Sequence, residues 1–223
     1  MPEALPGLVL FDLDGTLADT APDLGAAANR LRIEDGLPLI DDEALRPYTS
    51  QGARGLLFAA YGMTAEDPRF ERYRARFLTH YAAAICRRTR LFDGIADLLA
   101  ALEAGAIPWG VVTNKHARFT LPLLEALQLD QRAACIVSGD TTQRPKPAPD
   151  PLLFACTQVG TLPADTWYIG DDLRDILAGK AAGMGTIAVR YGYLGDGGNP
   201  AEWGADHLVD HPDEIATLFG LAC

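Results

Sequence analysis

The chain has 223 residues, of which 48% are hydrophobic and 22% charged, a composition that supports one large or two small globular domains. Its formal net charge of −11 at pH 7 argues against binding to nucleic acid or to an anionic membrane, because the chain would repel their phosphate groups. An anionic substrate would therefore have to be attracted by a few local cations or by a metal ion.

The cysteines and the start of the chain predict a cytoplasmic protein. The sequence opens with MPEALPG, which has no basic start before a long apolar run, and no segment is long enough to span a bilayer. No pattern in the sequence predicts an oligomeric state. The cysteines form no Cys-x-x-Cys pair, so they suggest neither a zinc site nor a disulfide framework; they are Cys86, Cys135, Cys156 and Cys223.

The first predicted element is a strand at residues 8–11, which ends in the polar sequence DLDGT. Short apolar runs bounded by turn residues are typical of strands buried on both faces, and open α/β sheets bind ligands where such strands end. Asp12 and Asp14 repel each other, and a hard divalent cation would offset that repulsion. Gly15 allows a tight turn, and Thr16 offers a hydroxyl beside N–H groups that could hold an anion. A strand-end turn without a ligand is the alternative that this stretch leaves open.

The next part of the chain predicts only helices, at residues 22–37, 41–45, 50–61 and 67–88. In the last of these, Asp67 suits the N-cap and Pro68 the first helical position. One apolar stripe runs along that helix with spacings of three and four residues, formed by Phe70, Tyr73, Phe77, Tyr81 and Ile85. An insertion of this kind predicts a helical domain of residues 18–90 within a domain made of residues 1–17 and 91–223.

From residue 92 onward, strands and helices alternate. The predicted strands are 109–113, 134–138, 166–170, 186–189 and 207–210. The predicted helices are 96–104, 117–129, 150–160, 173–182 and a final one after residue 210. Alternation with short connections indicates βαβ units, so the fold class is α/β with a Rossmann-like parallel sheet covered by helices on both faces.

Polar residues also follow other predicted strands and loops. Because parallel strands end at the same edge of a sheet, we expect these side chains to gather near Asp12 and Asp14. The residues expected at that edge are Thr113 after one strand, Lys146 in the proline-stiffened loop RPKPAP, and Asp171 with Asp175 after a later strand; Asn114, Lys115 and Asp172 stand beside them in the sequence.

These motifs, in this order and across the whole chain, resemble the haloacid dehalogenase superfamily of phosphohydrolases. The resemblance rests on DLDGT at 12–16, VVTN at 111–114, Lys146 in RPKPAPD and GDDLRD at 170–175. The helical insertion between the first two motifs matches the position of that superfamily's cap domain. The resemblance therefore implies a Rossmann-like core with an inserted α-helical cap.

The resemblance implies that a small-molecule phosphomonoester is hydrolysed with Mg²⁺ through an aspartyl-phosphate. Asp12 would attack phosphorus, and Asp14 would protonate the leaving oxygen and then take a proton from water. Mg²⁺ would be bound by Asp12, Asp171 and the backbone carbonyl of Asp14. The phosphoryl oxygens would be held by Thr113, Lys146, Asn114 and the backbone at Gly15 and Thr16. Asp175 would support Lys146 or a metal-bound water. The resemblance assigns no role to Asp172.

The reaction class depends on Asp14. The dehalogenases and phosphonate-cleaving members of the superfamily lack an acid at this position, so a carboxyl here indicates phosphoester chemistry. Sugar phosphomutases share the acid and stay open as an alternative. A non-enzymatic receiver domain of two-component signalling is a more distant alternative, because such domains have neither a helical insertion nor an acid two residues after the phosphorylated aspartate.

Three segments bear on the substrate: TNK at 113–115, SQGARGLL at 50–57 and the tail at 191–215. They resemble phosphoglycolate phosphatases and N-acetylmuramic acid 6-phosphate phosphatases, which implies a substrate that carries both a phosphate and a carboxylate. Arg54 could bind that carboxylate through two hydrogen bonds. A solvated arginine on the helix surface is the equally open alternative.

Overall fold

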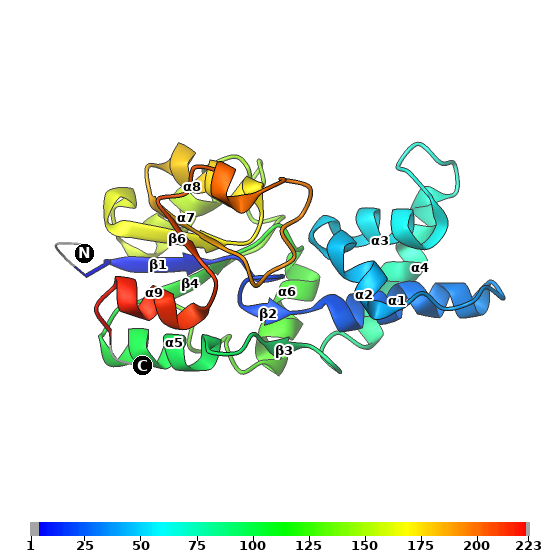
Figure 1. Cartoon of the computed structure of the whole chain (residues 1–223), viewed down its shortest axis with the longest axis horizontal. Helices are drawn as coiled ribbons and strands as arrows, with labels where there is room; N and C mark the ends of the chain where they lie inside the picture. The colour runs from blue at the N-terminus through cyan, green and yellow to red at the C-terminus, as the bar shows by residue number, and fades with distance from the viewer. Residues whose placement is uncertain (1–4, 222–223) are drawn as a thin grey trace.

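A computed structural model describes residues 5–221 and contains a six-stranded parallel sheet (Figure 1). The strand order is β5-β4-β1-β6-β7-β8, and neighbours pair in parallel throughout. This confirms the predicted fold class. The strands are β1 (Leu8–Phe11), β4 (Trp109–Val112), β5 (Cys135–Val137), β6 (Thr166–Gly170), β7 (Gly185–Val189) and β8 (His207–Val209).

Strand β1 lies inside the sheet, between β4 and β6, and all four of its residues are buried. Its side chains alternate between two apolar layers, since Val9 and Phe11 pack in one cluster and Leu8 and Leu10 in another. This explains why the strand is an unbroken apolar run.

Helices cover both faces of the sheet, as Figure 1 shows. The layer on the side of Val9 is closed by α5 (Ile95–Ala104), α6 (Ala117–Ala126) and α9 (Pro212–Leu218). The opposite layer is closed by α7 (Asp150–Val159) and α8 (Leu173–Ala182).

Helices α1 to α4 form a separate helical unit beyond the end of the sheet (Figure 1). Their apolar side chains form one cluster, which includes Leu31, Leu56 and Phe77 and is joined by Phe119 of α6. Two short strands, β2 (Ala18–Asp19) and β3 (Arg90–Leu91), pair antiparallel where the chain enters and leaves the helical unit. The helices are α1 (Ala21–Glu34), α2 (Asp42–Leu45), α3 (Gly52–Tyr61) and α4 (Phe70–Ala83). The domain boundaries stay a prediction.

The structure corrects the longest predicted helix. Helix α4 covers Phe70–Ala83 rather than residues 67–88. Asp67 does not cap it; its carboxylate accepts a hydrogen bond from the Arg69 backbone at 2.8 Å and closes a turn before the helix. The apolar stripe is buried from Phe70 to Tyr81, whereas Ile85 lies beyond the helix and is partly buried.

Other element ends also shift. The predicted helix 117–129 ends at Ala126, the helix 22–37 ends at Glu34, and α3 begins only after a 3₁₀ helix at Arg46–Gln51. Strands β2 and β3 have two residues each, too few to leave a sequence pattern.

Within residues 5–221, no helix combines the length and apolar character that a membrane crossing requires. In that same range Cys86, Cys135 and Cys156 are free thiols, and Cys223 lies outside the described residues.

Candidate active site

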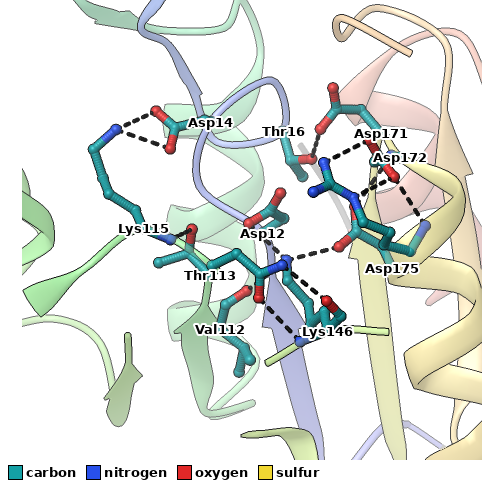
Figure 2. A network of polar contacts seen from close by, with 12 residues as sticks. Asp12, Asp14, Thr16, Val112, Thr113, Lys115, Lys146, Asp171, Asp172 and Asp175 are labelled. Carbon is teal, nitrogen blue, oxygen red and sulfur yellow. Dashed lines mark hydrogen bonds and ion pairs between the residues drawn. The ribbon is translucent and has the colours of Figure 1, made fainter. Parts of the chain in front are cut away.

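The predicted polar residues meet at the carboxyl end of the sheet, as Figure 2 shows. They border a cavity of about 450 Å³ between the sheet and the helical unit. That volume is typical of sites for small organic ligands. The motif residues that line it are Asp12, Asp14, Thr113, Asn114, Lys146, Asp171, Asp172, Arg174 and Asp175.

The loop after β1 places Asp12 at the base of the cavity. The Asp12 backbone N–H donates to the Ile169 carbonyl at 2.9 Å, which ties the loop to β6. Gly15 has φ +91°, and a Cβ built on it would overlap the carboxylate of Asp171. Glycine is therefore required here both by the backbone conformation and by the close approach of Asp171.

Lys146 is a buried cation among carboxylates, with its side chain 2% exposed. Its ammonium lies 2.9 Å from Asp12 Oδ1 and donates to Asp175 Oδ1 at 2.7 Å and to the Tyr168 hydroxyl at 2.7 Å. Burial lowers the pKa of Lys146, but Asp12 and Asp175 outweigh that effect and raise it. Lys146 therefore stays charged.

The position of Lys146 is fixed by Asn114. The Asn114 side chain donates to the Lys146 carbonyl and accepts from the Lys146 N–H, both at 3.0 Å. Thr113 is buried nearby, and its hydroxyl accepts from the Lys115 N–H at 3.2 Å. The structure thus shows Asn114 holding Lys146, a contact that sequence reasoning did not foresee.

Asp171 and Asp175 complete an acidic cluster with Asp12. One carboxylate oxygen from each of the three lies within 4.8 Å of the others. Asp171 accepts from the Thr16 hydroxyl at 2.9 Å and from the Tyr193 N–H at 2.8 Å. Burial, followed by the charges of Asp12 and Asp175, raises the pKa of Asp171 well above its ordinary value.

The charge of this cluster fits a hard cation. The three carboxylates exceed the charge of the Lys146 ammonium, which contacts Asp12 and Asp175. Within residues 5–221, Asp12 Oδ1 is buried without a well-aligned hydrogen-bond donor although Lys146 is close. Oxygen donors carrying excess negative charge are the ligands that Mg²⁺ and Ca²⁺ prefer. The residues present can therefore hold a divalent cation.

Asp14 belongs to the same loop as Asp12 but faces another way. Figure 2 shows its carboxylate turned toward Lys115, whose ammonium donates to the two oxygens at 2.7 and 2.9 Å. The Thr20 hydroxyl donates to the same carboxylate at 2.5 Å. The sequence indicated Lys115 only as the residue after Asn114, and it was not among the predicted site residues.

The helical unit supplies the far wall of the cavity. Arg54 on α3 is exposed and lines the cavity, and within residues 5–221 it makes no ion pair. Arg74 of the helical unit and Arg118 at the start of α6 also line it. The aromatic and aliphatic lining residues are Leu24, Phe70, Phe77, Leu78, Tyr81 and Phe119. The wall is thus apolar with several arginines.

Asp172, which had no predicted role, begins helix α8. Its carboxylate accepts from the Arg174 N–H at 2.9 Å and pairs with the Arg174 guanidinium at 2.8 Å. Arg174 in turn donates to the Ser50 carbonyl of the helical unit at 2.9 Å. These contacts connect the loop after β6 to the opposite wall of the cavity.

Comparisons with known proteins agree with this geometry. A family model described as haloacid dehalogenase-like hydrolase matches residues 9–189. The chain is 47% identical to the N-acetylmuramic acid 6-phosphate phosphatase of Pseudomonas aeruginosa, over 96% of this chain and 95% of that protein. It is 43% identical to a phosphoglycolate phosphatase of Xanthomonas campestris, over 94% and 95%. The crystal structure of a predicted phosphoglycolate phosphatase from Haemophilus somnus superposes with a TM-score of 0.83 at 27% identity, over 95% and 97%.

Proposed function

The chain belongs to the haloacid dehalogenase-like hydrolases and is a phosphatase, and from that premise we propose that it hydrolyses N-acetylmuramic acid 6-phosphate with Mg²⁺ through an aspartyl-phosphate on Asp12. The observation that carries the substrate is the cavity wall, which combines aromatic side chains with Arg54, an arginine that makes no ion pair within residues 5–221. A phosphosugar with an acidic substituent is large enough to contact both.

In the proposed reaction, Asp12 attacks phosphorus and the ester P–O bond breaks as Asp14 gives a proton to the leaving oxygen. Water then attacks phosphorus and gives a proton back to Asp14, the bond between Asp12 and phosphorus breaks, and inorganic phosphate leaves. For the first step Asp14 must turn from Lys115 toward the leaving oxygen. Asp12 lies beside Lys146, whereas Asp14 lies beside Lys115. These different surroundings support different roles for the two acids.

The proposed cation is Mg²⁺, held by Asp12, Asp171 and the backbone carbonyl of Asp14. When bound, it would neutralise charge on the phosphoryl oxygens and on the attacking carboxylate. Lys146 and the Thr113 hydroxyl would hold the remaining phosphoryl oxygens, together with N–H groups at Gly15 and Thr16. Asp175 would keep Lys146 in place through their 2.7 Å contact.

The test is the initial rate of phosphate release with Mg²⁺ from a panel of phosphate esters, with Asp12→Asn as the blank. N-acetylglucosamine 6-phosphate is the matched substrate, because it has the same sugar without the lactyl carboxylate. We expect kcat/KM for N-acetylmuramic acid 6-phosphate to exceed that for the matched sugar by at least about tenfold. Conversion of glucose 1-phosphate to glucose 6-phosphate without phosphate release would instead identify a mutase.

A second candidate substrate is 2-phosphoglycolate, which the resemblance to the Xanthomonas phosphoglycolate phosphatase favours. It carries the same two charged groups, a phosphate and a carboxylate, but it would leave most of the aromatic wall without contact. A higher kcat/KM for 2-phosphoglycolate than for N-acetylmuramic acid 6-phosphate would therefore identify 2-phosphoglycolate as the preferred substrate.

Arg54 is the proposed ligand of the substrate carboxylate. Arg54→Ala should raise KM for N-acetylmuramic acid 6-phosphate. It should leave KM for p-nitrophenyl phosphate unchanged, because that ester has no carboxylate. Arg54→Lys is the matched control that keeps a cation in place. Equal losses on the two substrates would show that Arg54 does not bind the carboxylate.

A further inference from the structure

Lys115 occupies a position that the proposed chemistry does not use. It lies at the end of the loop after β4, its side chain is 8% exposed, and its ammonium contacts both oxygens of Asp14. It also lies over the ring of Tyr81 from α4, 4.9 Å from the ring centre. One side chain therefore joins the loop after β1 to the helical unit.

The two buried lysines contact different acids of the site. Lys146 pairs with Asp12 and Asp175, and Lys115 pairs with Asp14. Lys146 keeps Asp12 at its side of the site, and Lys115 keeps Asp14 apart from Asp12 and Asp175. Without the Lys115 ammonium, the Asp14 carboxylate would keep only the Thr20 hydroxyl of its present partners within residues 5–221, and it could swing toward Lys146 or a bound cation.

The contact with Tyr81 sets where that ammonium lies. Tyr81 is buried in the apolar cluster of the helical unit, and its ring packs against Phe119 at 5.6 Å between centres. A cation over a tyrosine face is attracted to it, more strongly when water is excluded. The Lys115 side chain thus contacts both Tyr81 of the helical unit and Asp14 of the loop after β1.

We propose that Lys115 is a positioning residue for Asp14, held in place by Tyr81, so that the acid reaches the leaving oxygen only from a defined starting geometry. This inference rests on the proposed role of Asp14 as acid and base. General acid catalysis requires the proton donor within hydrogen-bond reach of the leaving oxygen. Loss of Lys115 should therefore harm esters whose leaving group needs a proton.

Phenyl phosphate and p-nitrophenyl phosphate provide that comparison. They have nearly the same shape and no carboxylate, but p-nitrophenolate is a stable anion and leaves without a proton. The parameter to compare is kcat/KM, because it reports the steps up to departure of the leaving group and excludes later breakdown of the aspartyl-phosphate.

The experiment measures both substrates with Lys115→Met, which keeps the apolar stem and removes the charge. We expect kcat/KM for phenyl phosphate to fall about tenfold more than for p-nitrophenyl phosphate. Lys180→Met, an exposed lysine on α8, is the matched control and should change neither value. Equal losses on both esters would overturn the proposal.

Asp14→Asn separates this inference from the proposed function. If Asp14 is the acid, Asp14→Asn alone should show the selective loss on phenyl phosphate, and adding Lys115→Met should not increase it. Selective losses that multiply in the double variant would mean that Lys115 does not act through Asp14. Absence of the selective loss in Asp14→Asn would instead refute the acid role itself, and the inference would fall with it.

Folding is checked with the same variants. The thermal midpoint of Lys115→Met is compared with that of the unchanged chain, and Lys115→Arg returns a cation to the site. The ratio to follow is kcat/KM for phenyl phosphate divided by kcat/KM for p-nitrophenyl phosphate. Recovery of this ratio by Lys115→Arg supports positioning by charge. A ratio that stays as low as in Lys115→Met, in a folded Lys115→Arg variant, contradicts it.

Discussion

At the scale of single residues, Gly15 shows how closely the backbone approaches the acidic cluster. We expect Gly15→Ala to lower activity about a hundredfold or more, because its Cβ would displace Asp171 from its place beside Asp12. Gly36→Ala is the matched control: Gly36 also has positive φ, +69°, but no atom lies within 4 Å of its Cβ position. That control should lose only about 1–2 kcal/mol of stability and keep its activity. Activity and thermal unfolding are measured on both, and equal loss of activity would contradict the explanation.

The acidic cluster also predicts how Mg²⁺ binding depends on pH. Burial, only partly opposed by Lys146, raises the pKa of Asp175 to about 6. A carboxyl that is more basic in the folded chain binds more protons there, so its contribution to the free energy of unfolding falls as pH rises from about 4 to about 6. Mg²⁺ should reverse this loss, because in the proposed site it would pair with the ionised carboxylates of Asp171 and its neighbours.

We therefore expect Mg²⁺ to stabilise the chain by about 3 kcal/mol at a hundredfold excess over its Kd at pH 7.5, and by less at pH 5. The measurement is the thermal midpoint with Mg²⁺ and with a chelator at each pH. Asp171→Asn serves as the control and should lose most of the gain. The same gain at both pH values would show that these carboxyls do not bind the ion.

At the scale of an element, helix α8 depends on Asp172 at its start. The Asp172 side chain accepts from the Arg174 N–H, and Asp175 completes a reciprocal capping pair with the Asp172 backbone. Asp172→Ala should cost about 1 kcal/mol of unfolding free energy, whereas Asp172→Asn should cost only a few tenths, because asparagine also caps helices. Urea unfolding distinguishes the two. Equal costs would assign the effect to the ion pair with Arg174 rather than to the cap.

At the scale of the whole molecule, Asp23 connects the two chain segments that join the sheet to the helical unit. From α1, its buried carboxylate accepts from the Arg88 and Thr89 N–H groups at 2.8–3.0 Å and from the Thr89 hydroxyl at 2.8 Å. Asp23→Ala would leave these donors without their partner, and we expect a loss of about 3 kcal/mol in the free energy of unfolding. The amide protons of Arg88 and Thr89 should also exchange faster with solvent.

Asp97 is the matched control for Asp23, since it is also in the first turn of a helix but is exposed. Asp97→Ala should cost less than about 1 kcal/mol, the size of a helix-dipole interaction. A loss for Asp23→Ala as small as that for Asp97→Ala would mean that the second connecting segment does not depend on Asp23.

The sequence by itself determined the elements whose causes are local. Strands β1 and β6 and helix α8 have the predicted bounds to the residue, because unbroken apolar runs, turn residues and a closing glycine at Gly183 mark them. The order of the motifs likewise predicted the meeting of Asp12, Lys146 and Asp171 at one sheet edge, since parallel strands end together. The family and the phosphatase activity followed from the same pattern.

Only the tertiary structure decided the contacts between segments far apart in the chain. Lys115 meets Asp14 across 101 positions, and the Tyr193 hydroxyl, 173 positions away, accepts the Thr20 N–H. Strands β2 and β3 exist only because the two connecting segments pair with each other. Such contacts leave no periodic pattern in the sequence, because each depends on where folding brings two distant segments of the chain together. The sequence therefore predicted which residues gather at the sheet edge, and only the folded arrangement of their loops decided which cation lies beside each acid.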